Sequence, residues 1–264
     1  MKHYKDITSA ENNQYKQIKK LAHSARERRK QKTTLLDGMH LLHALADTNG
    51  SLELVILRQN YEDEIEIQSC LKRFASTPGI VLSATLFDKV SPVETPTGIL
   101  AIYKMHVTKP ITNDCAVLLE NIQDPGNLGA IFRTAVAAGV DAVYLSKGCT
   151  EAWSPKVLRA AMGAHFSLAI KEQQNLSQIC LDFPLSIATQ LDVSTSLYDL
   201  DLSDRVAFLF GNEGNGLSTS LSAQATHKIR IPMRGKIESL NVAAATAICL
   251  FERVRQKENQ ENIY

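Results

Sequence analysis

Polar residues that could hold an anionic ligand follow an apolar run in the middle of the chain. Residues 117–119 are apolar, and the turn residues 124–126 follow them. Asn127 then stands at the N-cap position expected for an amphipathic helix, and Arg133 lies off the apolar stripe of that helix. The loop between such a strand and helix is where open α/β sheets bind ligands. Taken alone, the stretch fits an ordinary strand-to-helix turn with a surface arginine equally well.

Two later stretches repeat this order of strand, polar loop and helix. Residues 206–218 read as an apolar strand that enters a loop rich in Gly and Asn, with one carboxylate, Glu213. Residues 229–252 read as a short strand, a polar loop and a helix that begins near Ser239 and Asn241. We therefore expect three strand ends to converge on one site.

The three motifs together resemble those of the SpoU/TrmH family of RNA ribose 2′-O-methyltransferases, part of the SPOUT superfamily. All three occur in the family's order, over roughly residues 114–255. This combination is far more specific than any one motif. The matching positions are Asn127 and Arg133 in the first motif, Gly211, Glu213 and Gly216 in the second, and Ile231-Pro232-Met233 with Ser239 to Val242 in the third.

The resemblance implies both a fold and a reaction. The fold is a parallel α/β sheet tied into a deep trefoil knot, a topology too rare to be expected from periodicity. The reaction transfers a methyl group from S-adenosylmethionine to a ribose 2′-hydroxyl of RNA. Family members bind the cofactor in the knot and dimerise through adjacent helices, so a homodimer is expected. By position, the implied catalytic residues are Arg133, Asn127, Glu213, Ser239 and Asn241, and the implied cofactor-binding residues are Gly211, Ile231, Leu240, Thr189 and Met233.

Simpler structural roles remain open for these residues. The side chains of Ile231 and Leu240 could pack in the core. Asn127 and Asn241 could cap helices, and Glu213 could form a loop salt bridge that contributes little.

The role that the family gives to Arg133 is to remove the proton from the acceptor hydroxyl. A guanidinium has a pKa above about 12 and is normally never deprotonated. Arg133 is therefore either a strongly perturbed base or a cation that holds the target phosphate and lowers the pKa of the hydroxyl. The magnitudes favour the cation. Whether a dimer partner contributes to the site cannot be read from the sequence.

Length and composition predict a globular protein of two domains. The chain has 264 residues, 44% of them hydrophobic, and a net charge of +1. Its five cysteines are scattered, without Cys-x-x-Cys or a nearby His at ligand spacing, which favours reduced thiols in the cytoplasm over disulfides or a metal site. The first twenty residues lack the apolar core of a signal peptide, and no apolar run approaches the length of a membrane span. We expect a soluble, cytoplasmic protein without metal or membrane partner.

Positive charge is concentrated at the N-terminus. Residues 1–32 hold ten Lys and Arg against three Asp and Glu, a net charge of +7, so the remainder carries −6. Most such runs are solvated helix faces. Next to the RNA methyltransferase motifs, a phosphate-binding arm is the better interpretation, because Lys and Arg that neutralise phosphates give sequence-independent affinity. The proposed RNA-binding residues here are Arg26, Arg28, Arg29 and Lys30.

The domain boundaries follow from composition and resemblance. Residues 1–106 resemble the small α/β, ribosomal-protein-like domain that precedes many TrmH-type catalytic domains and binds RNA. Within it, residues 35–46 show helical periodicity. Residues 107–113 read as a linker, and residues 114–264 as the catalytic domain. That domain should include a helix over 153–163, where Arg159 is a further RNA-binding candidate. It should end in a helix from 241 to about 255, which is apolar nearly all round through residues 242–251 and so should be buried between other elements.

Two other functional classes compete with this interpretation. A Rossmann-type oxidoreductase would need Gly-x-Gly-x-x-Gly after its first strand, and the Gly-Asn loop at 211–216 has the wrong spacing and place. An RNA-binding or assembly protein that has lost catalysis would not be expected to keep the motif residues. Ribosomal RNA is the favoured substrate and transfer RNA the alternative, but the sequence identifies neither the RNA nor the nucleotide.

Overall fold

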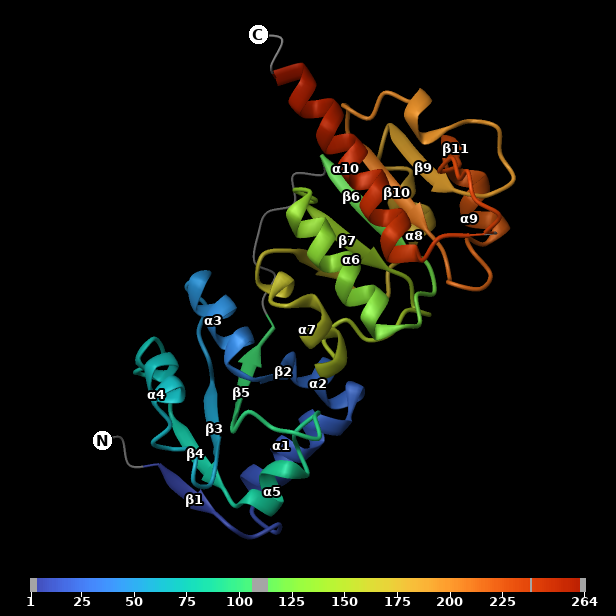
Figure 1. The fold of residues 1–264 in the computed structure, drawn as a ribbon. Coiled ribbons are helices and arrows are strands. Elements are labelled where there is room, and N and C mark those ends of the chain that lie inside the picture. Colours follow the sequence, from blue (N-terminus) through green and yellow to red (C-terminus); the bar gives the residue numbers. More distant parts are fainter. Residues whose placement is uncertain (1–3, 106–113, 238, 262–264) are drawn as a thin grey trace. The chain divides into compact units, whose positions relative to one another are not determined.

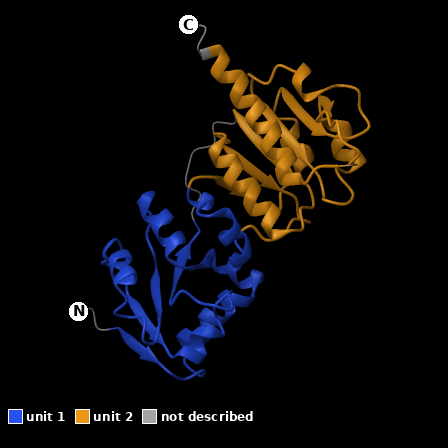
Figure 2. Cartoon of the chain, viewed as in Figure 1, with its two compact units in different colours: residues 1–106, 153–166 blue, residues 107–152, 167–264 orange. Residues whose placement is uncertain are grey.

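The computed structural model describes residues 4–105, 114–237 and 239–261, so the expected linker at 107–113 lies outside the described residues. The chain forms two compact units (Figure 2). The first unit comprises residues 1–106 and 153–166, and the second comprises residues 107–152 and 167–264. The division thus differs from the expected boundaries at one place, because residues 153–166 belong to the first unit.

The first unit is built on a five-stranded mixed sheet in the order β1-β4-β3-β5-β2. Strand β5 runs antiparallel to both β2 and β3, whereas β3, β4 and β1 are parallel. The strands are β1 (Lys5–Ile7), β2 (Thr33–Asp37), β3 (Leu54–Arg58), β4 (Gly79–Leu82) and β5 (Ile99–Lys104). The helices are α1 (Asn13–His23), α2 (Ala25–Gln31), α3 (Met39–Asp47), α4 (Ile65–Lys72), α5 (Ala84–Asp88) and α7 (Pro155–Ala161).

The helix expected over residues 35–46 was wrong at its start. Residues 35–37 belong to β2, and the helix α3 begins only at Met39. Gly38 separates the two elements with a φ of 85°, a conformation that glycine adopts without strain. Strand β2 is buried along its whole length. Leu35 stands four residues before Met39 and seven before Leu42, so this strand residue fitted the apolar spacing of the helix that follows.

Residues 153–166 complete the aromatic core of the first unit. The ring of Trp153 lies 6.1 Å from that of Tyr103, and Phe166 meets the same tyrosine edge-on at 5.4 Å. The Thr34 hydroxyl donates a hydrogen bond of 2.9 Å to the Trp153 carbonyl. Large aromatic rings bury much apolar surface, and this burial accounts for the position of the segment in the first unit rather than the second.

The second unit contains a six-stranded, fully parallel sheet in the order β11-β9-β10-β6-β7-β8 (Figure 1). From β6 the chain proceeds outward to β7 and β8, then returns to β9 and β10 on the other side of β6. The strands are β6 (Cys115–Leu119), β7 (Ala142–Leu145), β8 (Ala169–Lys171), β9 (Leu185–Thr189), β10 (Val206–Phe210) and β11 (His227–Ile229). This reversal of direction places a topological switch point between β6 and β10.

Helices cover both faces of this sheet. Helices α6 (Pro125–Ala137) and α10 (Val242–Glu261) pack against each other on one face (Figure 1). On the other face, α8 (Leu176–Cys180) and α9 (Thr219–Gln224) pack together, and their side chains join a buried cluster with Leu118 and Leu209.

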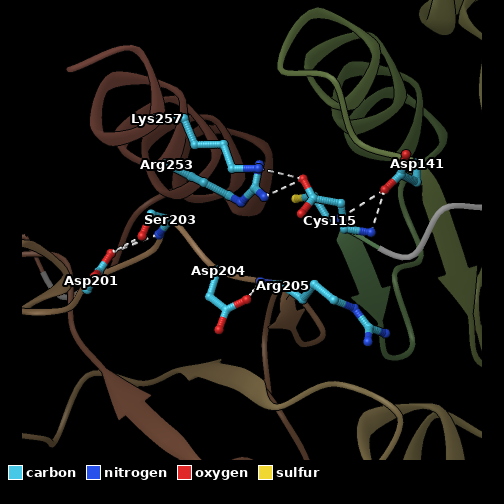
Figure 3. Close-up of polar contacts among 9 residues, drawn as sticks. Cys115, Asp141, Asp201, Ser203, Asp204, Arg205, Arg253 and Lys257 are labelled. Carbon is cyan, nitrogen blue, oxygen red and sulfur yellow. Dashed lines mark hydrogen bonds and ion pairs between the residues drawn. The ribbon is translucent and has the colours of Figure 1, made fainter. Parts of the chain in front are cut away.

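Helix α10 differs from expectation in two ways. It extends to Glu261 rather than ending near residue 255. Its apolar stretch is also not completely buried between other elements, because Phe251 remains 47% exposed in this chain. At the amino end of the sheet, Arg253 and Lys257 of α10 bind Asp114, each at 2.7 Å. Figure 3 shows the two cations pointing toward the start of β6, next to Cys115. No helix among the described residues is long and apolar enough to cross a membrane.

Candidate functional site

A cavity of about 490 Å³ opens at the carboxyl ends of β9, β10 and β11, beside the starts of α6 and α10. Parallel α/β sheets bind ligands in this place, outside the strand ends at the switch point. The volume lies within the range of small-molecule sites. Its lining combines apolar and polar side chains: Asn127, Thr189, Gln190, Leu191, Phe210, Gly211, Asn212, Glu213, Gly214, Gly216, Ile231, Met233, Ser239, Leu240, Asn241, Val242 and Ala245.

Nine of the ten predicted catalytic and cofactor-binding residues line this cavity, and Arg133 is the exception. The three motifs therefore meet in space, although up to 114 positions separate them in the sequence. Loops after β9, β10 and β11 supply most of the wall. The remaining lining residues come from the first turn of α6 and the start of α10.

Three side chains link the motifs through hydrogen bonds. The Asn127 amide Nδ2 donates to Glu213 Oε1 at 3.1 Å, and the Asn241 amide Nδ2 donates to Asn127 Oδ1 at 2.8 Å. Asn241 Oδ1 in turn accepts from the backbone N–H groups of Ala243 and Ala244 at the start of α10. Each motif thus contributes one member to a continuous chain of hydrogen bonds.

The groups at the two ends of this series of hydrogen bonds fix the direction in which each bond is donated. The Glu213 carboxylate can only accept hydrogen bonds, and the free N–H groups at a helix start can only donate. Both amides must therefore point their NH₂ groups toward Glu213 and their oxygens toward α10. Neither amide can flip without losing hydrogen bonds. The series of hydrogen bonds therefore holds the β10 loop and the starts of α6 and α10 in one arrangement.

Hydrogen bonds also set the charge state of Glu213. Burial by itself would raise the pKa of this carboxyl, but hydrogen bonds from its own backbone N–H, from the Asn127 amide and from the backbone N–H groups of Asp124 and Gln123 hold its pKa below the ordinary value. The carboxylate is therefore ionised at neutral pH. Its hydrogen-bond donors are the backbone N–H groups of Gln123 and Asp124 before α6, the Asn127 amide within that helix and the adjacent Asn212 amide. Glu213 therefore braces the start of α6 against the β10 loop rather than binding Arg133.

The position expected for Asn127 was wrong by three residues. The N-cap of α6 is Asp124, whose side chain accepts from the Asn127 backbone N–H, and Pro125 occupies the first helical turn. Asn127 therefore lies inside the helix, and its amide is available to the chain of hydrogen bonds. In contrast, Asn241 does cap its helix while also binding Asn127.

Asn212 lies at the centre of the β10 loop, and the sequence motifs did not single it out. Its Oδ1 accepts from the backbone N–H groups of Gly214 and Asn215 at 2.9 and 3.1 Å. Its Nδ2 donates at 2.8 Å to the carbonyl of Asn121, in the loop after β6. An Asn before Gly-rich residues is a signal for such a side-chain turn, so the role could have been inferred from local sequence.

Gly211 makes the tight shape of this loop possible. A Cβ atom at this position would collide with the backbone of Gly216 and Leu217, so no other residue fits without displacing the loop. The loop is closed by paired backbone hydrogen bonds between Asn212 and Gly216, at 2.8 and 3.0 Å. Thr189 also has a structural contact, because its hydroxyl donates to the Leu209 carbonyl at 3.1 Å.

Arg133 is exposed on α6, six residues beyond Asn127, and does not line the cavity of its own chain. Val136 and Ala137, three and four positions further on, are exposed as well, and residues at this spacing share one face of a helix. The outer face of α6 thus presents a cation next to apolar side chains.

The predicted RNA-binding residues have different environments. Arg26, Arg29 and Lys30 of α2 are exposed. Arg28 is only 5% exposed, and its guanidinium donates to the Leu21 and Ala22 carbonyls, so its assignment to RNA was wrong. Its position on the helix turns it inward, and the free carbonyls at the end of α1 satisfy it.

Arg159 is exposed on α7, within the first unit, where it faces a buried carboxyl. Burial raises the pKa of Asp37, and the nearby Arg159 charge opposes that rise. Arg159 therefore has at least one structural partner besides any RNA.

The cavity can hold a ligand with an apolar part and an anionic part. Ile231, Met233 and Leu240 provide apolar surface, while amide groups and the N–H donors at the start of α10 suit a carboxylate. These features fit S-adenosylmethionine, the cofactor implied by the motif resemblance. Among the described residues, no group of three or more His, Cys, Asp or Glu is placed to hold a metal ion.

Comparisons with known proteins agree with this geometry. Residues 114–251 match the SpoU rRNA Methylase family, and residues 12–101 match the MRM3-like substrate binding domain. The chain is 34% identical to the 23S rRNA (guanosine(2553)-2′-O)-methyltransferase RlmP of Bacillus subtilis (strain 168), over 94% of this chain and 98% of that protein. It resembles the crystal structure of an AdoMet-bound rRNA methyltransferase from Sinorhizobium meliloti with a TM-score of 0.80 and 27% identity, over 96% of this chain and 98% of that one. It is also 34% identical to the 23S rRNA (guanosine-2′-O-)-methyltransferase RlmB of Haemophilus ducreyi, over 55% of this chain and 61% of that protein.

Proposed function

The chain belongs to the SpoU rRNA Methylase family, and from this premise we propose that it transfers the methyl group of S-adenosylmethionine to a ribose 2′-hydroxyl of ribosomal RNA. The observation that carries the proposal is that all three motifs meet at one cavity, where hydrogen bonds connect Glu213, Asn127 and Asn241. Ribosomal RNA is favoured over transfer RNA because the B. subtilis relative, matched over nearly its whole length, is named as a 23S rRNA methyltransferase.

The cofactor, when bound, supplies a methyl group on a sulfonium that is already a good leaving group. The protein must therefore mainly align the acceptor oxygen with the methyl carbon. We assign the apolar wall to Ile231, Met233 and Leu240, and close backbone approach to Gly211. The helix start at Asn241 would face the cofactor carboxylate. Thr189 and Ser239 would complete the lining.

We assign to Arg133 the role of a cation at the target phosphate. A guanidinium next to the acceptor ribose lowers the pKa of the 2′-hydroxyl electrostatically without losing its own proton. The exposed position of Arg133, outside the cavity of its own chain, supports action at the cavity of a second copy.

A homodimer would bring this arginine to the partner's site. Two observations support a dimer through α6 and α10. Val136 and Phe251, on these two neighbouring helices, are 36% and 47% exposed, and exposed apolar groups on packed helices mark interaction surfaces. We further propose that the segment before α10 is knotted, as in the family that the motifs resemble.

We propose that the first unit binds the RNA substrate. The exposed Arg26, Arg29 and Lys30 on α2 support this role, as does the match of residues 12–101 to a substrate binding domain. Five free cysteines, four of them buried, suit a reducing compartment, and we propose the cytoplasm as the site of action.

Variants of Arg133 test the assignment of the catalytic cation. Arg133→Ala should lose methyl transfer in single-turnover assays while calorimetric affinity for S-adenosylmethionine is kept. A single-turnover rate within about tenfold of wild type, less than about 1.4 kcal/mol of transition-state stabilisation, would remove Arg133 from the mechanism.

Mixed dimers test the assignment of Arg133 to the partner's site. Arg133→Ala is mixed with Leu240→Arg, a variant in which the cavity is blocked. If the arginine acts on the second copy, random mixing of these two inactive chains of a symmetric dimer should restore about a quarter of the wild-type rate. No recovery, with exchange of chains demonstrated, would place Arg133 at its own chain's cavity.

A further inference from the structure

Four cations lie within nine residues at the edge of the second unit. Residues 114–152 and 167–264 hold eleven Lys and Arg against sixteen Asp and Glu, so this unit is acidic as a whole. Residues 228–236 hold four of those cations and no acidic residue. We call this set the basic strip: Lys228, Arg230, Arg234 and Lys236.

The basic strip borders the cavity. Strand β11 is the edge strand of the sheet (Figure 1), and its last residue, Ile229, is fully buried. Beyond it, Ile231 and Met233 line the cavity. All four cations are exposed. Lys228 and Arg230 alternate with the two isoleucines, as expected where successive side chains of an extended segment point to opposite sides.

Ion pairs within the described part of the chain do not explain the charges of the basic strip. None of its four cations forms an ion pair with a residue that the structure describes. Lysine on an edge strand can prevent unwanted pairing with another sheet, which would account for Lys228. That explanation does not extend to Arg234 and Lys236, which lie beyond the end of β11.

We propose that the basic strip binds the phosphates of the RNA strand that carries the target nucleoside. The inference rests on the proposed function, since it assigns a surface to the substrate of that same site. Lys228 and Arg230 are alternate residues of an extended segment, which lie about 6.6 Å apart, similar to successive phosphates of an RNA strand. Because the strip adjoins the cavity wall, a strand held there runs past the opening, and a ribose between the held phosphates reaches the cavity.

The test measures how RNA affinity depends on salt. The full-length chain binds a short, fluorescently labelled single-stranded RNA, and its dissociation constant is measured over a series of salt concentrations. Each lost phosphate contact should reduce the slope of log K against log[salt] by about 0.7. The variant in which all four cations of the strip are replaced by Gln should therefore lose a slope of about 3, and Arg234→Gln alone about 0.7.

A matched control keeps the experiment specific. Lys171 lies on β8, the strand at the opposite edge of the same sheet. Lys171→Gln removes the same single charge as Arg234→Gln, and it should leave the slope unchanged. Calorimetric titration with S-adenosylmethionine shows whether each variant is folded and keeps an intact cavity. The affinity for the cofactor should equal that of the wild type, because no residue of the basic strip lines the cavity.

The possible results separate the basic strip from the proposed function. If the wild type methylates ribosomal RNA but the fourfold variant keeps the wild-type salt slope, the basic strip is not an RNA surface and the function stands. If the variant keeps the slope but changes its oligomeric state in sedimentation, the strip is a contact between protein chains, which also overturns the proposal. Absence of methyl transfer by the wild type, with the slope reduced in the variant, would refute the function and leave the RNA surface.

Discussion

Replacing Asn212 with Ala should weaken cofactor binding far more than it affects global stability. The Asn212 side chain makes a long hydrogen bond of 3.4 Å to Glu213 and three shorter ones of 2.8 to 3.1 Å. The three shorter bonds hold the β10 loop in shape and tie it to the loop after β6. A net contribution of about 0.5–1.5 kcal/mol each, taken at the low end because the loop is exposed, gives about 1.5–3 kcal/mol.

This loss should appear mainly as the cost of ordering the loop when the cofactor binds. At 1.4 kcal/mol per factor of ten, the dissociation constant for S-adenosylmethionine should rise by about 10- to 100-fold. Isothermal titration calorimetry measures this constant directly. Because the loop lies at the surface, the denaturant midpoint should move little in comparison.

The neighbouring Asn215 offers a matched control. It is exposed in the same loop, and only its backbone N–H takes part in the loop's hydrogen bonds. Asn215→Ala should bind S-adenosylmethionine like the wild type. If Asn212→Ala binds within about twofold of Asn215→Ala, a difference below about 0.4 kcal/mol, the side-chain bonds of Asn212 do not organise the site.

Three further predictions concern charge and burial. Hydrogen bonding lowers the pKa of Glu213, so the contribution of its carboxylate to the site should be complete above the ordinary carboxyl pKa and lost as the pH falls through the lowered pKa. Affinity for the cofactor should therefore decline in that pH range in the wild type and not in Glu213→Gln. Identical pH profiles of the two proteins would refute this. Arg28→Ala should lower the free energy of unfolding in denaturant by about 2–3 kcal/mol, because it removes the guanidinium that donates to the carbonyls at the end of α1. Arg29→Ala, at an exposed position, should instead lower the affinity for RNA. Equal stability of Arg28→Ala and the wild type would contradict the structural role of Arg28. Asp114→Ala removes the anion from Arg253, whose side chain is 5% exposed, and should lower the free energy of unfolding by about 2 kcal/mol. This is below the range for a fully buried pair, because the side chain of Asp114 is 43% exposed. A loss under about 0.5 kcal/mol would show that water replaces the ion pair.

Residue types and order predicted the catalytic sheet well because its strands follow simple rules. The apolar runs at 117–119 and 206–210 formed strands of a parallel sheet, and polar residues that follow them met at one edge, as the geometry of parallel strands requires. The burial of Ile229 and the placement of Ile231 beside the cavity follow from alternation in the same way.

Where sequence patterns failed, tertiary contacts decided the outcome. Nothing local indicates that residues 153–166 join the first unit, because their partner Tyr103 lies fifty residues away in the chain. Nothing in a basic run distinguishes Arg28, which turns inward to two carbonyls, from its exposed neighbours. The N-cap of α6 was misplaced because Asp124 and Asn127 are both good caps, and only the structure shows which side chain accepts from the other's N–H.

The most direct test of the central claim is transfer of a labelled methyl group by the purified chain. The protein is incubated with methyl-labelled S-adenosylmethionine and deproteinised ribosomal RNA, and the RNA is digested to nucleosides and separated. Label in a 2′-O-methylated nucleoside, lost with Arg133→Ala, is the predicted result. Label on a base, or no transfer by a chain that binds the cofactor, would contradict the proposal that this cavity aligns a ribose oxygen with the methyl group.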